Sequence, residues 1–242
     1  MFKSKIAAAA FIAAALFVTI QATAPAIAGS AKKHAVFTVR IENISDKDGL
    51  TAADGSKYPF ALSPGFFSVT KRSFDLFKTG AKASAALEAQ AEDGDPEMLL
   101  DVFKKAGLTG TIKVFNIPAG GERPSPILPG GTYEFTFSAV EGMKLNLATM
   151  YGQSNDLFYA PAGPIGLFDK NGDPLTGDIT GDLLLWDAGT EVNQAPGIGA
   201  DQAPRQAMKN TGVDENGVVG LVNDAFTYPA AKDVMRVTVF VK

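Results

Sequence analysis

The chain has 242 residues, a formal net charge of −4 at pH 7 and no cysteine. The missing cysteines exclude a disulfide scaffold and thiol catalysis. The acidic balance argues against nucleic acids and anionic membranes as main partners. The only histidine is His34, so neither a histidine-rich zinc site nor a buried histidine general base is expected.

The first residues have the pattern of an export signal. Lys3 and Lys5 precede an apolar run over 6–20, and Ala26–Ala28 is a small-residue cleavage site. Cleavage after Ala28 leaves residues 29–242, which are expected to form one domain in the periplasm or outside the cell. The run is short for a membrane span, and no later segment is long enough for one. An uncleaved N-terminal anchor is the alternative.

The next part of the chain predicts strands and loops. Apolar and mixed residues alternate over 35–42, which indicates a strand with one buried face. Residues 43–58 are rich in Asp, Gly and Ser and predict a loop. Pro64 and Gly65 predict a turn that leads into a short strand.

Residues 81–105 carry the helical signals of this chain. Good helix formers dominate from Ala81 to Ala91. Asp95 is a candidate N-cap with Pro96 at the first helical position, and Gly107 is a candidate terminator. A helical segment of this length between strands is expected to be an insertion.

From residue 111 the pattern is strand and turn. Alternating segments occur near residues 133–137 and 235–241, Asn171–Gly172 predicts a hairpin turn, and residues 188–216 predict a long loop. This pattern predicts an all-β protein, an antiparallel β-sandwich or barrel with a short helical insertion.

Two motif matches are better explained as coincidence. Ser68–Lys71 and Lys78–Gly80 fit patterns of penicillin-recognising serine enzymes, but they lie too close together. Asp169–Asp173 begins like a calcium loop, and Pro174 then stands where that loop needs glycine. A hairpin tip with solvated charges is the favoured interpretation.

Three carboxylates are the candidate metal ligands. Asp187 and Glu191 lie four residues apart on a small-residue turn that follows an apolar run, and Asp156 lies upstream. Hard cations need several converging oxygen ligands, so Asp156, Asp187 and Glu191 are predicted to form one site. The alternative is that these carboxylates only cap turns and that Trp186 only packs.

The segments around these residues resemble the spondin domain, the N-terminal module of F-spondin and mindin. The resemblance covers residues 35–241 and is most specific at Ser154–Phe158 and Trp186–Glu191. Further agreement lies at Leu62–Gly65, Ala91–Pro96, Leu128–Gly131 and Ala203–Gln206.

This resemblance implies an antiparallel β-sandwich similar to the synaptotagmin-type module. It also implies one Ca²⁺ ion at the loops of one end, held by Asp156, Asp187 and Glu191. Leu157 departs from the family's usual Trp, and Glu191 stands where animal members have Asp. The chain has no thrombospondin-type repeats, so matrix and integrin binding are not carried over.

The expected function is that of a secreted calcium-binding module for adhesion or ligand binding, without enzymatic activity. Its partner is expected to be an extracellular protein or glycan, which the sequence does not identify. Two alternatives stay open. One is a metal-assisted secreted hydrolase with Asp156 or Glu191 as general base, and the other is a purely structural exported domain.

Overall fold

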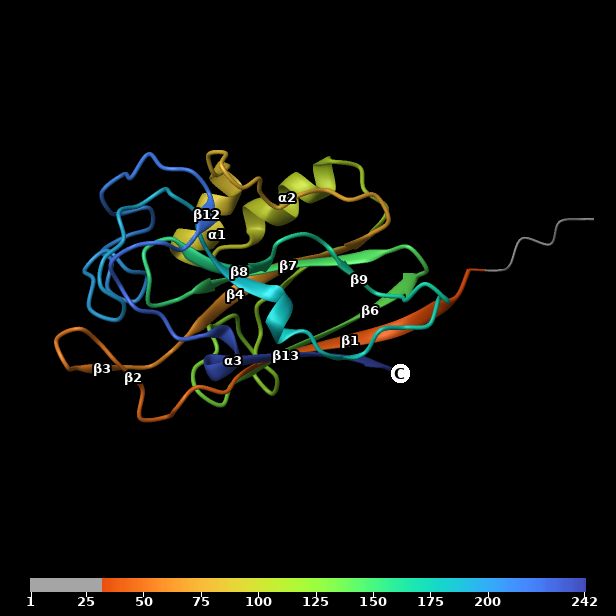
Figure 1. Cartoon of the computed structure of the whole chain (residues 1–242), viewed down its shortest axis with the longest axis horizontal. Coiled ribbons are helices and arrows are strands. Elements are labelled where there is room, and N and C mark those ends of the chain that lie inside the picture. Colours follow the sequence, from red (N-terminus) through yellow and green to blue (C-terminus); the bar gives the residue numbers. More distant parts are fainter. Residues whose placement is uncertain (1–31) are drawn as a thin grey trace, which may run out of the picture. The chain divides into compact units, whose positions relative to one another are not determined.

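Two antiparallel sheets face each other in the computed structural model, which describes residues 32–242 (Figure 1). The four-stranded sheet has the order β10 (Gly177–Asp178), β13 (Met235–Val241), β1 (His34–Asn43) and β6 (Thr132–Val140). The larger sheet has the order β12 (Gly220–Leu221), β11 (Leu183–Asp187), β8 (Leu157–Pro161), β7 (Lys144–Tyr151), β4 (Leu62–Thr70) and β5 (Gly110–Phe115), and β9 (Ile165–Gly166) also pairs with β7. The predicted signal peptide, residues 1–28, lies outside the described residues.

The main core fills the space between the two sheets. Phe67 of β4 stacks on Phe135 of β6 with ring centroids 4.0 Å apart, and Phe37 and Val39 of β1 are fully buried in the same cluster. Alternate residues of each strand point into this space, as the strand period of two requires. The all-β sandwich that the sequence predicts is therefore confirmed.

Two helices cover the outer face of the larger sheet, α1 (Ala85–Asp93) and α2 (Glu97–Lys105) (Figure 1). Phe66 of β4 packs on Phe103 of α2 with ring centroids 4.6 Å apart. The sheet is thus buried on both faces, and all five residues of β8 are buried. The predicted helical insertion forms a third layer of this fold.

Helix boundaries follow local capping. Ser84 is the N-cap of α1 and its hydroxyl accepts a hydrogen bond from the Leu87 N–H, while Gly94 ends the helix in the left-handed region. The prediction for α2 was wrong in detail. Pro96 is the N-cap rather than the first helical residue. Asp95 lies one residue before the N-cap, and its side chain accepts a hydrogen bond from the Glu97 N–H.

The predicted turn at Pro64 and Gly65 is also wrong, because both residues lie inside β4. The pairing with β7 shifts register between Leu62 and Gly65, which accommodates a proline within a sheet. A Cβ atom on Gly65 would lie 2.3 Å from the Ala148 carbonyl oxygen and 2.2 Å from the Phe115 ring. The glycine is needed for this close approach and not for a turn.

Short elements complete the fold. They are β2 (Leu50–Thr51) and β3 (Lys57–Tyr58), which pair within the predicted loop 43–58, a 3-10 turn at Thr180–Asp182, and α3 (Ala231–Val234). The final strand and the strand near residues 35–42 are confirmed by β13 and β1. Within residues 32–242, every helix is too short or too polar to span a bilayer.

Candidate metal centre

Strand pairing brings Asp156 and Asp187 together. In the antiparallel pair β8–β11, Asp187 lies opposite Leu157, and Asp156 is the residue just before it. The Ala188 N–H donates to the Asp156 carbonyl oxygen at 3.2 Å, which extends the pairing by one step. The two carboxylates therefore stand at the same end of the larger sheet, although they are distant in sequence.

The turn after β11 is built around both carboxylates. The Gly189 N–H donates to Asp187 Oδ1 at 2.7 Å, and Gly189 adopts a φ of 67°. Asp156 Oδ2 accepts three hydrogen bonds, from the Thr190 N–H at 2.7 Å, the Thr190 hydroxyl at 3.1 Å and the Glu191 N–H at 3.1 Å. Such side-chain acceptors satisfy backbone groups that a turn leaves unpaired.

The end of the long loop returns beside this turn and brings in a third carboxylate. Three backbone hydrogen bonds hold the return segment, which comprises residues 213–217: Val192 N–H to Val213 O at 2.8 Å, Glu215 N–H to Thr190 O at 2.9 Å, and Gly217 N–H to Gly189 O at 2.8 Å. This pairing places Glu215 over the turn that Asp187 begins.

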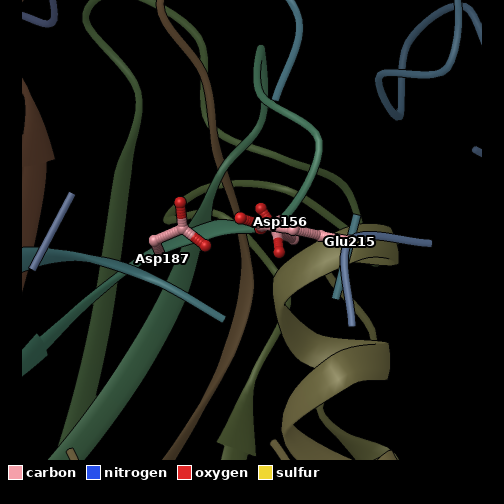
Figure 2. Close-up of side chains that lie close together, drawn as sticks. All are labelled: Asp156, Asp187 and Glu215. Atoms are coloured by element: carbon pink, nitrogen blue, oxygen red, sulfur yellow. The ribbon is translucent and has the colours of Figure 1, made fainter. Parts of the chain in front are cut away.

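Asp156, Asp187 and Glu215 form one acidic group among residues 32–242. One carboxylate oxygen of each lies within 4.8 Å of the others. Figure 2 shows the three side chains close together beside a helix. Asp156 directly precedes β8, Asp187 ends β11, and Glu215 belongs to the return segment. None of the ion pairs formed by the described residues involves them, so no lysine or arginine neutralises their charge.

One oxygen in this group has no hydrogen-bond partner. Asp156 is fully buried, and its Oδ1 atom has no hydrogen-bond partner. A buried carboxylate oxygen without a donor is costly, and a cation, a proton or a water molecule would each supply the missing interaction. Asp187 is half-buried and Glu215 is exposed, so the group opens toward solvent on the Glu215 side. The residues present fit a hard cation with oxygen ligands, with water completing its coordination.

The charges of the group oppose one another. Burial raises the pKa of Asp156 to about 7, and the negative charge of Asp187 adds to the effect. Burial also raises the pKa of Asp187, and burial together with the charge of Asp187 raises that of Glu215. Carboxylates in such a site bind a proton or a cation more readily than free ones.

The structure brings together two of the three predicted ligands. Glu191 is not in the group that Asp156 and Asp187 form, and Glu215 lies there. The Glu191 backbone N–H donates to Asp156, but its carboxylate accepts a hydrogen bond from Asn155 Nδ2 at 3.2 Å. Its role as a ligand stays a prediction. No sequence motif marks Glu215, because only the pairing of the return segment with the turn brings it beside Asp156 and Asp187.

The other motifs have structural explanations. Ser68 is buried within β4 while Lys71 and Lys78 are exposed, so no serine–lysine site forms. Asp169 Oδ1 accepts the N–H groups of Asn171 and Asp173, both at 2.8 Å, as in a polar turn at a hairpin tip. Trp186 packs on Phe77 with ring centroids 4.7 Å apart and donates to the Ala160 carbonyl oxygen.

No family model matches the chain, and no curated protein matches its sequence.

Proposed function

We propose that this chain is an exported calcium-binding β-sandwich module in which a metal ion orders one end of the sandwich for a partner. The observation that carries the proposal is the buried Asp156 Oδ1, which lacks a partner within a group of three carboxylates. The alternative of carboxylates that only cap turns accounts for Asp156 Oδ2 and for the Asp187 turn. It leaves Asp156 Oδ1 and the position of Glu215 unexplained.

Ca²⁺ is the ion that the donor set favours. The group offers carboxylate oxygens and neither imidazole nor thiolate, which suits a hard cation. Mg²⁺ requires near-ideal octahedral geometry, whereas Ca²⁺ accepts six to eight oxygen ligands in irregular arrangements. The resemblance of Ser154–Phe158 and Trp186–Glu191 to the spondin domain supports the same ion.

The proposed role of the ion is to join three segments that repel one another without it. Bound Ca²⁺ would offset the repulsion among the carboxylates at the ends of β8 and β11 and in the return segment. The return segment is held by backbone hydrogen bonds to the turn and closes the long loop that begins at Ala188. We propose that this ordered loop end presents the surface for an extracellular protein or glycan.

The test is a calorimetric titration of the purified chain with Ca²⁺, together with thermal unfolding. Asp187→Asn removes one charge of the group while keeping its shape, and Asp48→Asn, at an exposed site far along the chain, is the matched control. We expect heat of binding and a raised Tm for the wild type and the control, and neither for Asp187→Asn. An equal response in all three proteins contradicts the proposal.

A further inference from the structure

Strand β6 is an edge strand of the four-stranded sheet, and among residues 32–242 it pairs only with β1. Natural edge strands are protected from other strands by short length, lysine, proline or bulges. The other edges of this fold have such features, since β10 and β12 are two residues long and β5 carries Lys113. β6 has nine residues without lysine or proline, and its pairing with β1 has no register shift. Its outer edge is therefore open to another strand.

Hydrogen bonds at both ends of the β1–β6 pair show which main-chain groups of β6 point outward. The Asn43 N–H donates to the Gly131 carbonyl oxygen at 2.9 Å, and the Glu141 N–H donates to the Lys33 carbonyl oxygen at 3.0 Å. Bonding alternates along an antiparallel pair, so the odd-numbered residues of both strands bond across it. The main-chain groups of the even-numbered residues of β6 consequently point away from β1.

The unpaired stretch of this edge is symmetrical about Thr136. Before it, the Thr132 carbonyl oxygen accepts the Ala119 N–H at 2.7 Å, and after it the Val140 carbonyl oxygen accepts the Met143 N–H at 3.0 Å. Within residues 32–242, no hydrogen bond uses the outward main-chain groups of the exposed residues between these two ends, which are Glu134, Thr136 and Ser138.

We propose that β6 pairs with β6 of a second copy of this chain, antiparallel and about a two-fold axis at Thr136. In this register Thr136 lies opposite the same residue of the second copy, and Glu134 lies opposite Ser138. Each opposite pair exchanges two N–H to carbonyl bonds, so every open group is used and the two four-stranded sheets become one. A shift of two residues would place an open residue opposite Thr132 or Val140, whose carbonyl oxygens already accept a bond.

The side chains on this edge agree with the same register. Threonines directly opposite each other stabilise a strand pair, whereas like charges destabilise it. Glu134 would face the uncharged Ser138, and its carboxylate already accepts bonds from Arg40 Nε and Nη2 at 3.0 and 2.9 Å. No like charges meet along the pairing edge. The proposed dimer uses no residue of the acidic group and does not depend on the proposed function.

The test is sedimentation velocity of the purified chain from about 1 µM to about 1 mM, which gives the Kd of the dimer. We expect a reversible dimer for the wild type. Thr136→Lys and Thr136→Glu each place two like charges opposite each other at the axis and should raise the Kd at least about threefold. An equimolar mixture of these variants brings opposite charges together and should restore the wild-type Kd. Thr109→Lys, at an exposed position outside β6, is the control and should leave the Kd unchanged.

A wild type that stays monomeric at the highest concentration overturns the proposal, as does an unchanged Kd in both Thr136 variants. A mixture that dimerises no better than either variant alone overturns the register.

Ser138→Lys tests the register in the opposite direction and covers the case in which the Thr136 variants do not fold. It places a lysine opposite Glu134 of the second copy and should lower the Kd about threefold. An unchanged or raised Kd in a folded Ser138→Lys variant contradicts the proposal, and thermal unfolding checks that each variant is folded.

Discussion

Asp156 Oδ2 accepts the backbone N–H groups of Thr190 and Glu191, at 2.7 and 3.1 Å, while its Oδ1 atom is buried without a partner. One carboxylate thus has two roles at the end of the sandwich. One oxygen fixes the turn that follows β11, and the other remains available to a ligand. Turn capping and metal binding, which are alternatives at the level of sequence, are compatible in the folded protein.

The turn-capping role predicts a large loss of stability for Asp156→Ala. The change leaves the N–H groups of Thr190 and Glu191 and the Thr190 hydroxyl without their acceptor. Loss of such charge-assisted bonds, reduced by relief of carboxylate burial, is expected to lower the free energy of unfolding by about 2–4 kcal/mol. Urea unfolding without Ca²⁺ measures it. A change as small as that of the exposed Asp48→Ala would show that the bonds do not stabilise the turn.

The raised pKa values predict that the metal-free protein loses stability as the pH rises. Folding raises the pKa of Asp156 from 3.8 to about 7, of Glu92 from 4.5 to about 7, and of Glu191 from 4.5 to about 8. The folded state therefore holds more protons than the unfolded state between pH 4 and 8. The stabilising contribution of these groups is complete below about pH 4 and is lost as the pH rises through the folded pKa values.

The expected slope is at most about 1.4 kcal/mol per pH unit for each group. Denaturant unfolding in chelator at pH 5, 6, 7 and 8 measures it. Excess Ca²⁺ should remove the part of the decline that Asp156 contributes, because the ion replaces the proton of that carboxylate. A free energy of unfolding that rises between pH 5 and 8 in chelator would contradict the assignment of these groups as buried acids.

Glu215 and Glu191 should contribute differently to the proposed Ca²⁺ site. Glu215 lies in the acidic group with Asp156 and Asp187, and Glu191 does not. Glu215→Gln is expected to raise the Kd for Ca²⁺ at the acidic group about tenfold, equivalent to about 1.4 kcal/mol. Glu191→Gln should leave that Kd within about twofold. Calorimetric titration of both variants with Ca²⁺ measures the two Kd values. A larger increase in Kd for Glu191→Gln than for Glu215→Gln would support the ligand set that the spondin resemblance implies.

Gly189 links the backbone conformation of the turn to the position of Glu215 in the acidic group. Its φ of 67° belongs to the left-handed region, and a Cβ atom there would be 2.6 Å from the Val218 nitrogen. Gly189→Ala should therefore cost about 1–2 kcal/mol for the conformation alone, and more for the displaced return segment. Ca²⁺ affinity should fall with it, because Glu215 moves with that segment.

Gly55→Ala is the matched control for this effect. Gly55 also has a positive φ, 84°, but nothing lies within 4 Å of the added Cβ. It should cost about 1–2 kcal/mol and leave Ca²⁺ affinity unchanged. Equal stability losses and equal affinities in the two variants would show that the return segment does not depend on Gly189.

Local patterns of the sequence predict most of the strands, but long-range pairing decides the site. Alternation identifies β1, β6 and β13, and the turn after Trp186 identifies Asp187. Glu215 lies in a Gly-rich loop without periodicity, and only its backbone bond to Thr190 places it. The predicted turn at Gly65 is wrong because a glycine needed for close packing, here against Ala148, looks the same in sequence as a glycine needed for a turn.

The most direct test is a crystal structure of the chain grown with Ca²⁺. The account predicts an ion within about 2.3–2.6 Å of carboxylate oxygens of Asp156, Asp187 and Glu215, with Asp156 Oδ2 still bonded to the Thr190 N–H. A structure from crystals grown at millimolar Ca²⁺ with no ion between these three carboxylates would contradict the account.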